Sequence, residues 1–99
     1  MKEGQYQQEL KKKIRKRLPD AVILKNDPNW LQGFPDLTIL YKDRYAILEV
    51  KKDRSAEVQP NQSYYIDKVH GWAAFSSFIF PENEEEVLDG LQRSLEAGR

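Results

Sequence analysis

Hydrophobic residues recur every fourth position near the start of the chain. The stripe consists of Tyr6, Leu10, Ile14 and Leu18. This spacing predicts an amphipathic helix from about Glu3 to Leu18. Pro19 follows directly, and proline cannot continue a helix. We therefore expect one helix with a single buried face.

Three apolar runs follow, and their composition predicts strands. Residues 21–25, 37–41 and 45–51 are rich in aliphatic, β-branched and aromatic side chains. The polar tripeptide 42–44 separates the last two runs, so these should form an antiparallel hairpin. A fourth run, residues 73–80, has the same character.

Two further helices are expected around the fourth strand. Pro60 suits the first turn of a helix that runs to Val69, and Gly71 would stop it. A helix that joins the hairpin to the strand at 73–80 implies a right-handed crossover, which makes the joined strands parallel. Val87, Leu88, Leu91 and Leu95 mark a C-terminal helix. The predicted fold is α/β: an αβββαβ core with a mixed central sheet flanked by helices, and an extra C-terminal helix.

Length and composition narrow the chemistry. Ninety-nine residues suffice for one small domain, so we expect a single domain spanning 1–99. The chain has no cysteine and a single histidine, His70, which excludes disulfides, thiolate zinc sites and sites that need two imidazoles. It has no apolar run long enough to cross a bilayer and no signal-peptide pattern at its N-terminus, so we expect a cytoplasmic location and no membrane partner.

The net charge of zero hides an asymmetry between the two ends of the chain. Residues 1–25 carry eight Lys or Arg against three Asp or Glu, whereas residues 82–99 carry two against six. The cations cluster on the first helix as Lys11, Lys12, Lys13, Arg15, Lys16 and Arg17. They can form a solvated helix face, with a C-terminal cluster favoured by the helix dipole, or contact the phosphates of a nucleic acid.

The third predicted strand carries charges where a buried strand would not be expected to have them. Alternation places Ala46, Leu48 and Val50 on one face, and Ile47, Glu49 and Lys51 on the other. Both faces begin apolar, which indicates a central strand. An acid and an amine on such a strand cost desolvation free energy unless they are paired or bound to a cation.

A second carboxylate should meet them. Antiparallel pairing with the turn at 42–44 brings Asp36 level with Glu49 and Lys51, and Gly33 and Pro35 help to aim its side chain. Two carboxylates with room for water and phosphate suit Mg²⁺. The alternative is that Glu49 and Lys51 form an ion pair at the rim of the sheet and that Asp36 caps a turn.

The phrases Gly33-Phe-Pro-Asp-Leu37 and Ile47-Leu-Glu-Val-Lys51 lie so that twelve residues separate Asp36 from Glu49. This pattern resembles the Pro-Asp...(Asp/Glu)-x-Lys nuclease superfamily with its restriction-endonuclease-like fold. It looks most similar to the virus-type replication-repair (VRR-NUC) nucleases, which are related to Holliday junction resolvases. The resemblance extends over most of the chain, because the expected order of elements also matches.

The resemblance implies roles for individual residues. Asp36 and Glu49 match the metal carboxylates, the Val50 main-chain carbonyl is a further expected ligand, and Lys51 matches the catalytic lysine. Gln62, on the following helix, fits a glutamine of the family. The metal would be Mg²⁺ or Mn²⁺. Glu9 is a candidate for an additional metal ligand from the first helix, although it can instead pair with Lys13 on that helix.

Other residues have several interpretations. Lys25 and Gln32 can reach phosphate or stay solvated. Trp30 can stack on a base, fill a dimer interface or pack on its own loop, and we expect the last. His70 is expected to be a helix-end residue.

The expected function is a metal-dependent endonuclease acting on DNA. By resemblance, it would cut branched DNA such as junctions or flaps during replication, recombination or repair, in a bacterial or phage-infected cell, as a homodimer without a small-molecule cofactor. Two alternatives remain: an inactive nucleic-acid-binding module of the same fold, and a non-enzymatic α/β interaction protein.

Overall fold

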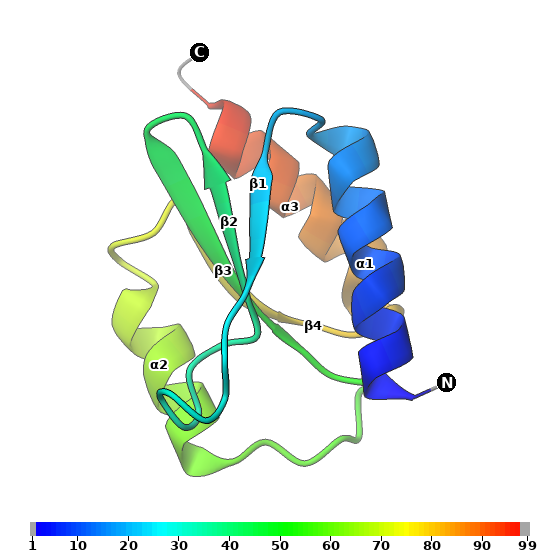
Figure 1. Ribbon diagram of the computed structural model, residues 1–99, viewed down its shortest axis with the longest axis vertical. Coiled ribbons are helices and arrows are strands. Elements are labelled where there is room, and N and C mark those ends of the chain that lie inside the picture. Colours follow the sequence, from blue (N-terminus) through cyan, green and yellow to red (C-terminus); the bar gives the residue numbers. More distant parts are fainter. Residues whose placement is uncertain (1, 98–99) are drawn as a thin grey trace.

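The computed structural model describes residues 2–97 and has the predicted order of helices and strands (Figure 1). The elements are α1 (Glu3–Arg17), β1 (Val22–Lys25), β2 (Leu37–Tyr41), β3 (Arg44–Val50), α2 (Pro60–Val69), β4 (Phe75–Ile79), a short 3-10 helix η1 (Pro81–Asn83) and α3 (Glu84–Glu96). The predicted α/β order is thus confirmed. The observed bounds differ from the predicted ones by no more than a few residues at each end.

The four strands form one mixed sheet in the order β1-β2-β3-β4. β1 pairs with β2 and β2 with β3 in antiparallel fashion, whereas β3 and β4 are parallel, as the intervening helix predicted. Tyr41 pairs with Arg44, so the hairpin loop is two residues long. Its first residue, Lys42, has a φ of 57°, the left-handed conformation that such short hairpin loops require.

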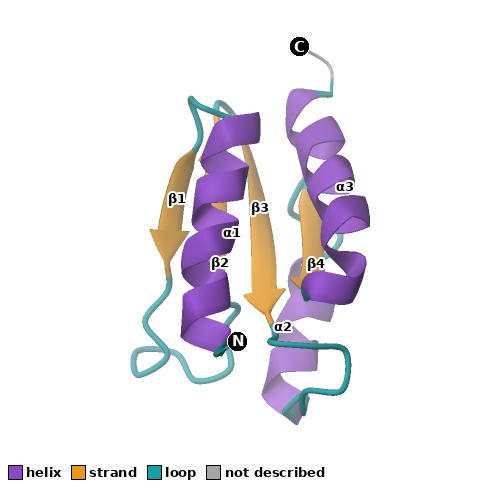
Figure 2. Ribbon diagram, turned by 90° about the vertical axis from the view of Figure 1, so that its right-hand side faces the viewer, coloured by secondary structure: helices purple, strands orange, loops and turns teal. Residues whose placement is uncertain are grey.

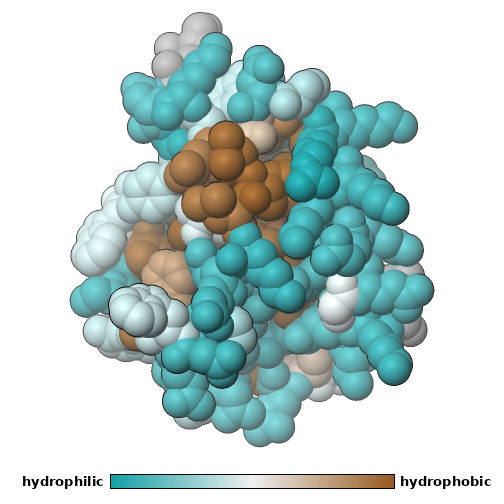
Figure 3. Space-filling model, viewed as in Figure 1, coloured by the Kyte–Doolittle hydropathy of each residue, from teal (hydrophilic) through white to brown (hydrophobic). Residues whose placement is uncertain are grey.

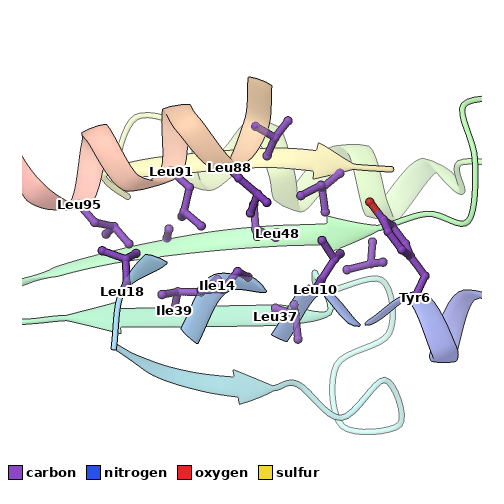
Figure 4. Packing of buried hydrophobic residues seen from close by; sticks show 14 residues of the cluster. Tyr6, Leu10, Ile14, Leu18, Leu37, Ile39, Leu48, Leu88, Leu91 and Leu95 are labelled. Carbon is purple, nitrogen blue, oxygen red and sulfur yellow. The ribbon is translucent and has the colours of Figure 1, made fainter. Parts of the chain in front are cut away.

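Helices cover the sheet on both faces (Figure 2). α1 and α3 lie side by side on one face, and the main core fills the space between them and the sheet (Figure 4). α2 packs on the other face around a smaller cluster of Ile47, Ile66 and Val69. The two faces of β3 therefore both pack against helices, which confirms the central strand that the alternation predicted.

The face that carries α2 is not covered over its whole width. Val22, Leu24 and Leu40 keep 52%, 45% and 40% of their surface exposed. Val22 pairs with Leu40 across β1 and β2, so their side chains project on the same face. Hydrophobic side chains gather there over β1 and β2 (Figure 3). No helix between residues 2 and 97 has the length and apolar character needed to traverse a membrane.

Candidate active site

The hairpin brings Asp36 and Glu49 to the same point. Leu37 pairs with Leu48, so the residue before β2 faces the residue after Leu48 in β3. The Asp36 N–H donates to Glu49 Oε1 over 3.2 Å, and the Val50 N–H donates to Asp36 Oδ2 over 2.8 Å. The two acidic residues therefore meet at one end of the β2–β3 ladder, on neighbouring strands.

Pro35 explains why this end of the ladder is open. Continuing the register would place Pro35 opposite Val50, and proline has no N–H to donate to the Val50 carbonyl. Asp36 takes over the other half of that pairing by accepting the Val50 N–H, while the Pro35 carbonyl accepts Asn26 Nδ2 instead. The Val50 carbonyl therefore receives no hydrogen bond from residue 35, and it lies beside the two acids.

Lys51 and Gln62 complete the cluster. Glu49 and Lys51 are 2% and 7% exposed, and Lys51 Nζ lies 3.7 Å from Glu49 Oε2. Lys51 Nζ donates to Gln62 Oε1 over 2.8 Å and to the Glu57 carbonyl over 3.0 Å. Gln62 Nε2 donates to Glu49 Oε2 over 2.8 Å, so one amide bridges the acid and the amine. The structure brings together all four side chains that the sequence proposed as catalytic.

Burial changes the proton affinity of both acids. Desolvation, reinforced by the nearby Asp36 carboxylate, raises the pKa of Glu49 to about 8. Desolvation also raises the pKa of Asp36, although the hydrogen bond from the Val50 N–H opposes this rise. A divalent cation bound between the buried Glu49 and the half-buried Asp36 would relieve this penalty on their charged forms.

The oxygen donors fit a hard cation. Asp36, Glu49 and the Val50 carbonyl offer two carboxylates and a main-chain oxygen, the ligand types that Mg²⁺ and Mn²⁺ accept. Among residues 2–97, no group of three or more His, Cys, Asp or Glu side chains is arranged to hold a metal. An ion bound here would therefore complete its coordination with water or with oxygens of a phosphate.

The first helix does not add a third acid to this pair. Glu9 is half-buried and forms no group with Asp36 and Glu49. The ion pair of Lys13 goes to Glu84 on α3, not to Glu9. Gln7 is the polar residue that α1 buries: it is 6% exposed, and its Oε1 has no hydrogen-bond partner in the described part of the chain. Sequence reasoning missed Gln7, although it continues the i, i+3, i+7 face of Leu10 and Ile14.

The basic run of α1 proves to be partly neutralised. Lys13 Nζ lies 2.6 Å from Glu84 Oε2, and Arg17 contacts Glu85 and Asp89 at 3.1 and 2.7 Å. We name this set of ion pairs between α1 and α3 the α1–α3 clasp. Lys12, Arg15 and Lys16 are exposed and Lys11 is half-buried. These four remain candidates for phosphate contact, whereas Lys13 and Arg17 are held by acids of α3.

Other cations lie closer to the cluster. The beginning of α1 lies near the end of β3, whereas the basic run occupies the far half of the helix (Figure 1). A hollow of about 510 Å³ joins the two near ends, and its lining includes Lys2, Lys51 and Lys52 together with Glu3 and Glu57. Lys25 is close enough to Asp36 to favour its charged form. Sequence reasoning named Lys25 but missed Lys2 and Lys52, which lie outside the basic run of α1.

Two expectations about single residues have different outcomes. Trp30 is 89% exposed, so the preferred interpretation, packing on its own loop, is wrong. His70 is exposed at the C-terminal cap of α2, as expected of a helix-end residue. The Gln32 carbonyl accepts Asn61 Nδ2 over 3.2 Å, which ties the loop of Trp30 to the start of α2.

Fold and site together define an α/β protein with an Asp–Glu–Lys–Gln cluster, half of it buried, at the open end of a hairpin. Comparison of the chain with family models, with curated proteins and with solved structures finds no match. A function for this protein is therefore inferred from the geometry of the cluster.

Proposed function

We propose that the protein is a Mg²⁺- or Mn²⁺-dependent endonuclease that hydrolyses DNA phosphodiester bonds. The observation that carries this proposal is the convergence of Asp36, Glu49 and Lys51, with Gln62 hydrogen-bonded to both Glu49 and Lys51. An ion pair alone would require neither the second carboxylate nor the bridging amide. Oxygen ligands beside an ammonium group suit the hydrolysis of a phosphate ester.

Each residue has a distinct task in this proposal. Asp36, Glu49 and the Val50 carbonyl would hold the ion, which supplies Lewis acidity and lowers the pKa of a bound water. In hydrolysis the water oxygen loses a proton and bonds to phosphorus, while the bond to the leaving oxygen breaks and that oxygen takes up a proton, which gives a phosphate monoester and an alcohol. Lys51 Nζ orients the water or offsets the negative charge that develops on the phosphate. Gln62 fixes Lys51 and Glu49 relative to each other.

The cations near the cluster suggest how DNA approaches. Lys25 acts on Asp36, and Lys2 and Lys52 share a hollow with Lys51, so these three cations would contact the phosphates that flank the scissile bond. The exposed cations of α1, Lys12, Arg15 and Lys16, would contact DNA only where it extends along that helix. Contacts of this kind position the backbone without reading base sequence.

The proposed substrate is branched DNA, a junction or a flap, and the proposed assembly is a symmetric homodimer. Both follow from the resemblance of the Asp36 and Glu49-Val50-Lys51 motifs to those of the VRR-NUC nucleases. The uncovered apolar side chains of β1 and β2, namely Val22, Leu24 and Leu40, support the dimer because a second copy could cover them. Sedimentation should then give a dimer, and Leu24→Glu should give a monomer. A monomeric wild-type protein at assay concentration would remove this part of the proposal.

The direct test is cleavage of a labelled DNA panel by the pure protein. Junction, flap, single-stranded and duplex DNA are incubated with Mg²⁺, with Mn²⁺ or with EDTA, and Asp36→Asn is the matched control. The proposal expects metal-dependent cleavage by the wild-type protein alone. Binding of metal and DNA without cleavage would favour the inactive binding module. If the ions neither bind nor raise the melting temperature, the chain is better described as an interaction protein.

A further inference from the structure

Trp30 is the most exposed large hydrophobic residue among those described. It is 89% exposed, on the loop of residues 26–36 that leads from β1 to the metal-ligand candidate Asp36. Leu31, next to it, is 42% exposed. Single exposed hydrophobic residues are common on protein surfaces, so exposure alone assigns no function to Trp30. The residues around Trp30 indicate what its ring could bind.

The loop holds Trp30 in a defined place. The Trp30 N–H donates to the Asp27 carbonyl over 3.2 Å, and Asp27 Oδ1 accepts the Asn29 N–H over 2.8 Å. The far side of the loop lies against the start of α2 (Figure 1). There Gly33 has a φ of 85°, and a Cβ at this position would clash with the Asn61 side chain. An exposed aromatic ring on a braced loop loses little conformational entropy when it binds a ligand.

A hollow opens beside the indole ring. Its volume is about 390 Å³, and Asn26, Asp27, Trp30, Leu31 and Phe34 line it. Binding sites for small molecules have volumes of roughly 300–1,000 Å³ and combine apolar walls with a few polar groups. Two aromatic rings and a leucine with an amide and a carboxylate at the edge match a flat heterocycle that has hydrogen-bonding groups on its rim.

The hollow adjoins the candidate active site. Asn26, which lines it, donates its main-chain N–H to the Asp36 carbonyl over 2.8 Å. Its side-chain Nδ2 donates to the Pro35 carbonyl, also over 2.8 Å. The same residue therefore contacts the hollow and the proline–aspartate pair that presents the proposed metal ligand. A nucleotide next to the scissile phosphate would reach the hollow with its base.

We propose that Trp30 and the hollow beside it bind an unstacked nucleobase of the strand being cut, so that the protein selects sites where a base is unpaired. The inference rests on the proposed nuclease function and names its substrate feature. Aromatic side chains stack on bases of any sequence, since every base has a π face. Selection by base unpairing would therefore depend on DNA structure and not on sequence.

Trp30→Ala tests the proposal, and Trp72→Ala is the matched control. Trp72 is also exposed, at 65%, but follows the opposite end of α2 from Gln62. We expect Trp30→Ala to weaken binding of single-stranded and flap DNA by roughly 5- to 150-fold, while Trp72→Ala binds like wild type. The melting temperature of both variants should stay near that of the wild type, because neither ring is buried.

Fluorescence gives a second readout that does not depend on cleavage. The chain has two tryptophans, so Trp72→Phe leaves Trp30 as the only one. DNA with an unpaired base should quench its emission, and the same DNA with an abasic nucleotide at that position should not. An abasic nucleotide should also weaken binding to the wild type but not to Trp30→Ala.

The outcomes separate this inference from the nuclease proposal. If the wild type cleaves DNA and Trp30→Ala cleaves and binds like Trp72→Ala, the base site is refuted and the nuclease stands. If base-dependent quenching occurs without cleavage in any metal, the base site stands and the nuclease is refuted. Absence of both cleavage and quenching overturns both.

Discussion

Two charged regions of the molecule differ in what surrounds their charges. In the α1–α3 clasp, Arg17 meets two exposed acids of α3, whereas Lys13, which keeps 49% of its side chain exposed, meets Glu84, which keeps 12%. In the Asp36–Glu49–Lys51–Gln62 cluster, Glu49 and Lys51 are buried and the neutral amide of Gln62 holds them in place. Surface ion pairs contribute little to stability, whereas buried charged groups need a compensating partner. The basic run of α1 is therefore less informative about function than the Asp36–Glu49–Lys51–Gln62 cluster, although it contains more charges.

The largest expected effect comes from removing a member of the buried cluster. Asp36→Asn, Glu49→Gln and Lys51→Ala should each lower the cleavage rate by at least about 10²- to 10³-fold, because each removes charge stabilisation at the phosphate. The rate is measured on labelled DNA with Mg²⁺, and circular dichroism checks the fold. Removing an acid of the α1–α3 clasp, as in Asp89→Asn, should leave the rate unchanged. Wild-type cleavage by Asp36→Asn would falsify the assignment of the site.

A smaller effect is expected at Gln62, which acts by positioning its neighbours. Gln62→Ala should lower the rate by roughly 10- to 100-fold and raise the Mg²⁺ concentration needed for half-maximal cleavage, because Glu49 loses its orienting hydrogen bond. Gln8→Ala, at an exposed position of α1, is the control. A variant that loses activity with an unchanged metal requirement would show that Gln62 does not act through Glu49.

The parts of this architecture that local patterns specify were predictable from the sequence. Strand alternation and hairpin register placed Asp36 opposite Glu49, whereas Gln62 was proposed from the resemblance to the nuclease superfamily. The α1–α3 clasp was not predictable, because Lys13 and Glu84 lie 71 positions apart and no local pattern links them. The exposure of Trp30 was missed for a related reason: whether a loop side chain finds a partner depends on neighbouring elements, not on its own segment.

Affinity for DNA can show which cations contact the substrate. We compare Lys25→Ala/Lys52→Ala, beside the buried cluster, with Lys12→Ala/Lys16→Ala, on the exposed face of α1. Each lost phosphate contact should reduce the slope of log affinity against log salt by about 0.9. We expect a larger loss from the first pair in filter-binding titrations over a range of salt concentrations. A larger loss from the second pair would mean that DNA extends along α1 and that the basic run is its main contact.

The smallest expected effect is on the melting temperature, which a Glu→Gln substitution should change in opposite directions in the two regions. The raised pKa of Glu49 means that the folded protein holds a proton which the unfolded chain releases near pH 4.5. Its contribution to stability is therefore present below pH 4.5 and is lost as the pH rises through about 8. Glu49→Gln should raise the melting temperature of the metal-free protein at pH 8 by at least about 4 °C, the shift that roughly 1 kcal/mol produces in a domain of this size.

Glu84→Gln is the same chemical change in the α1–α3 clasp. It removes the charge that pairs with Lys13 and that accepts the hydroxyl of the buried Tyr6 over 2.9 Å, and the Glu84 side chain is only 12% exposed. It should therefore lower the melting temperature by about 4 °C or more, the shift that roughly 1 kcal/mol produces in a domain of this size. Mg²⁺ should raise the melting temperature of the wild type more at pH 8 than at pH 5, because the ligands must be deprotonated. Glu84→Gln should keep this metal response and Glu49→Gln should lose it. A melting temperature lowered equally by both substitutions would mean that Glu49 is an ordinary ion-pair partner of Lys51.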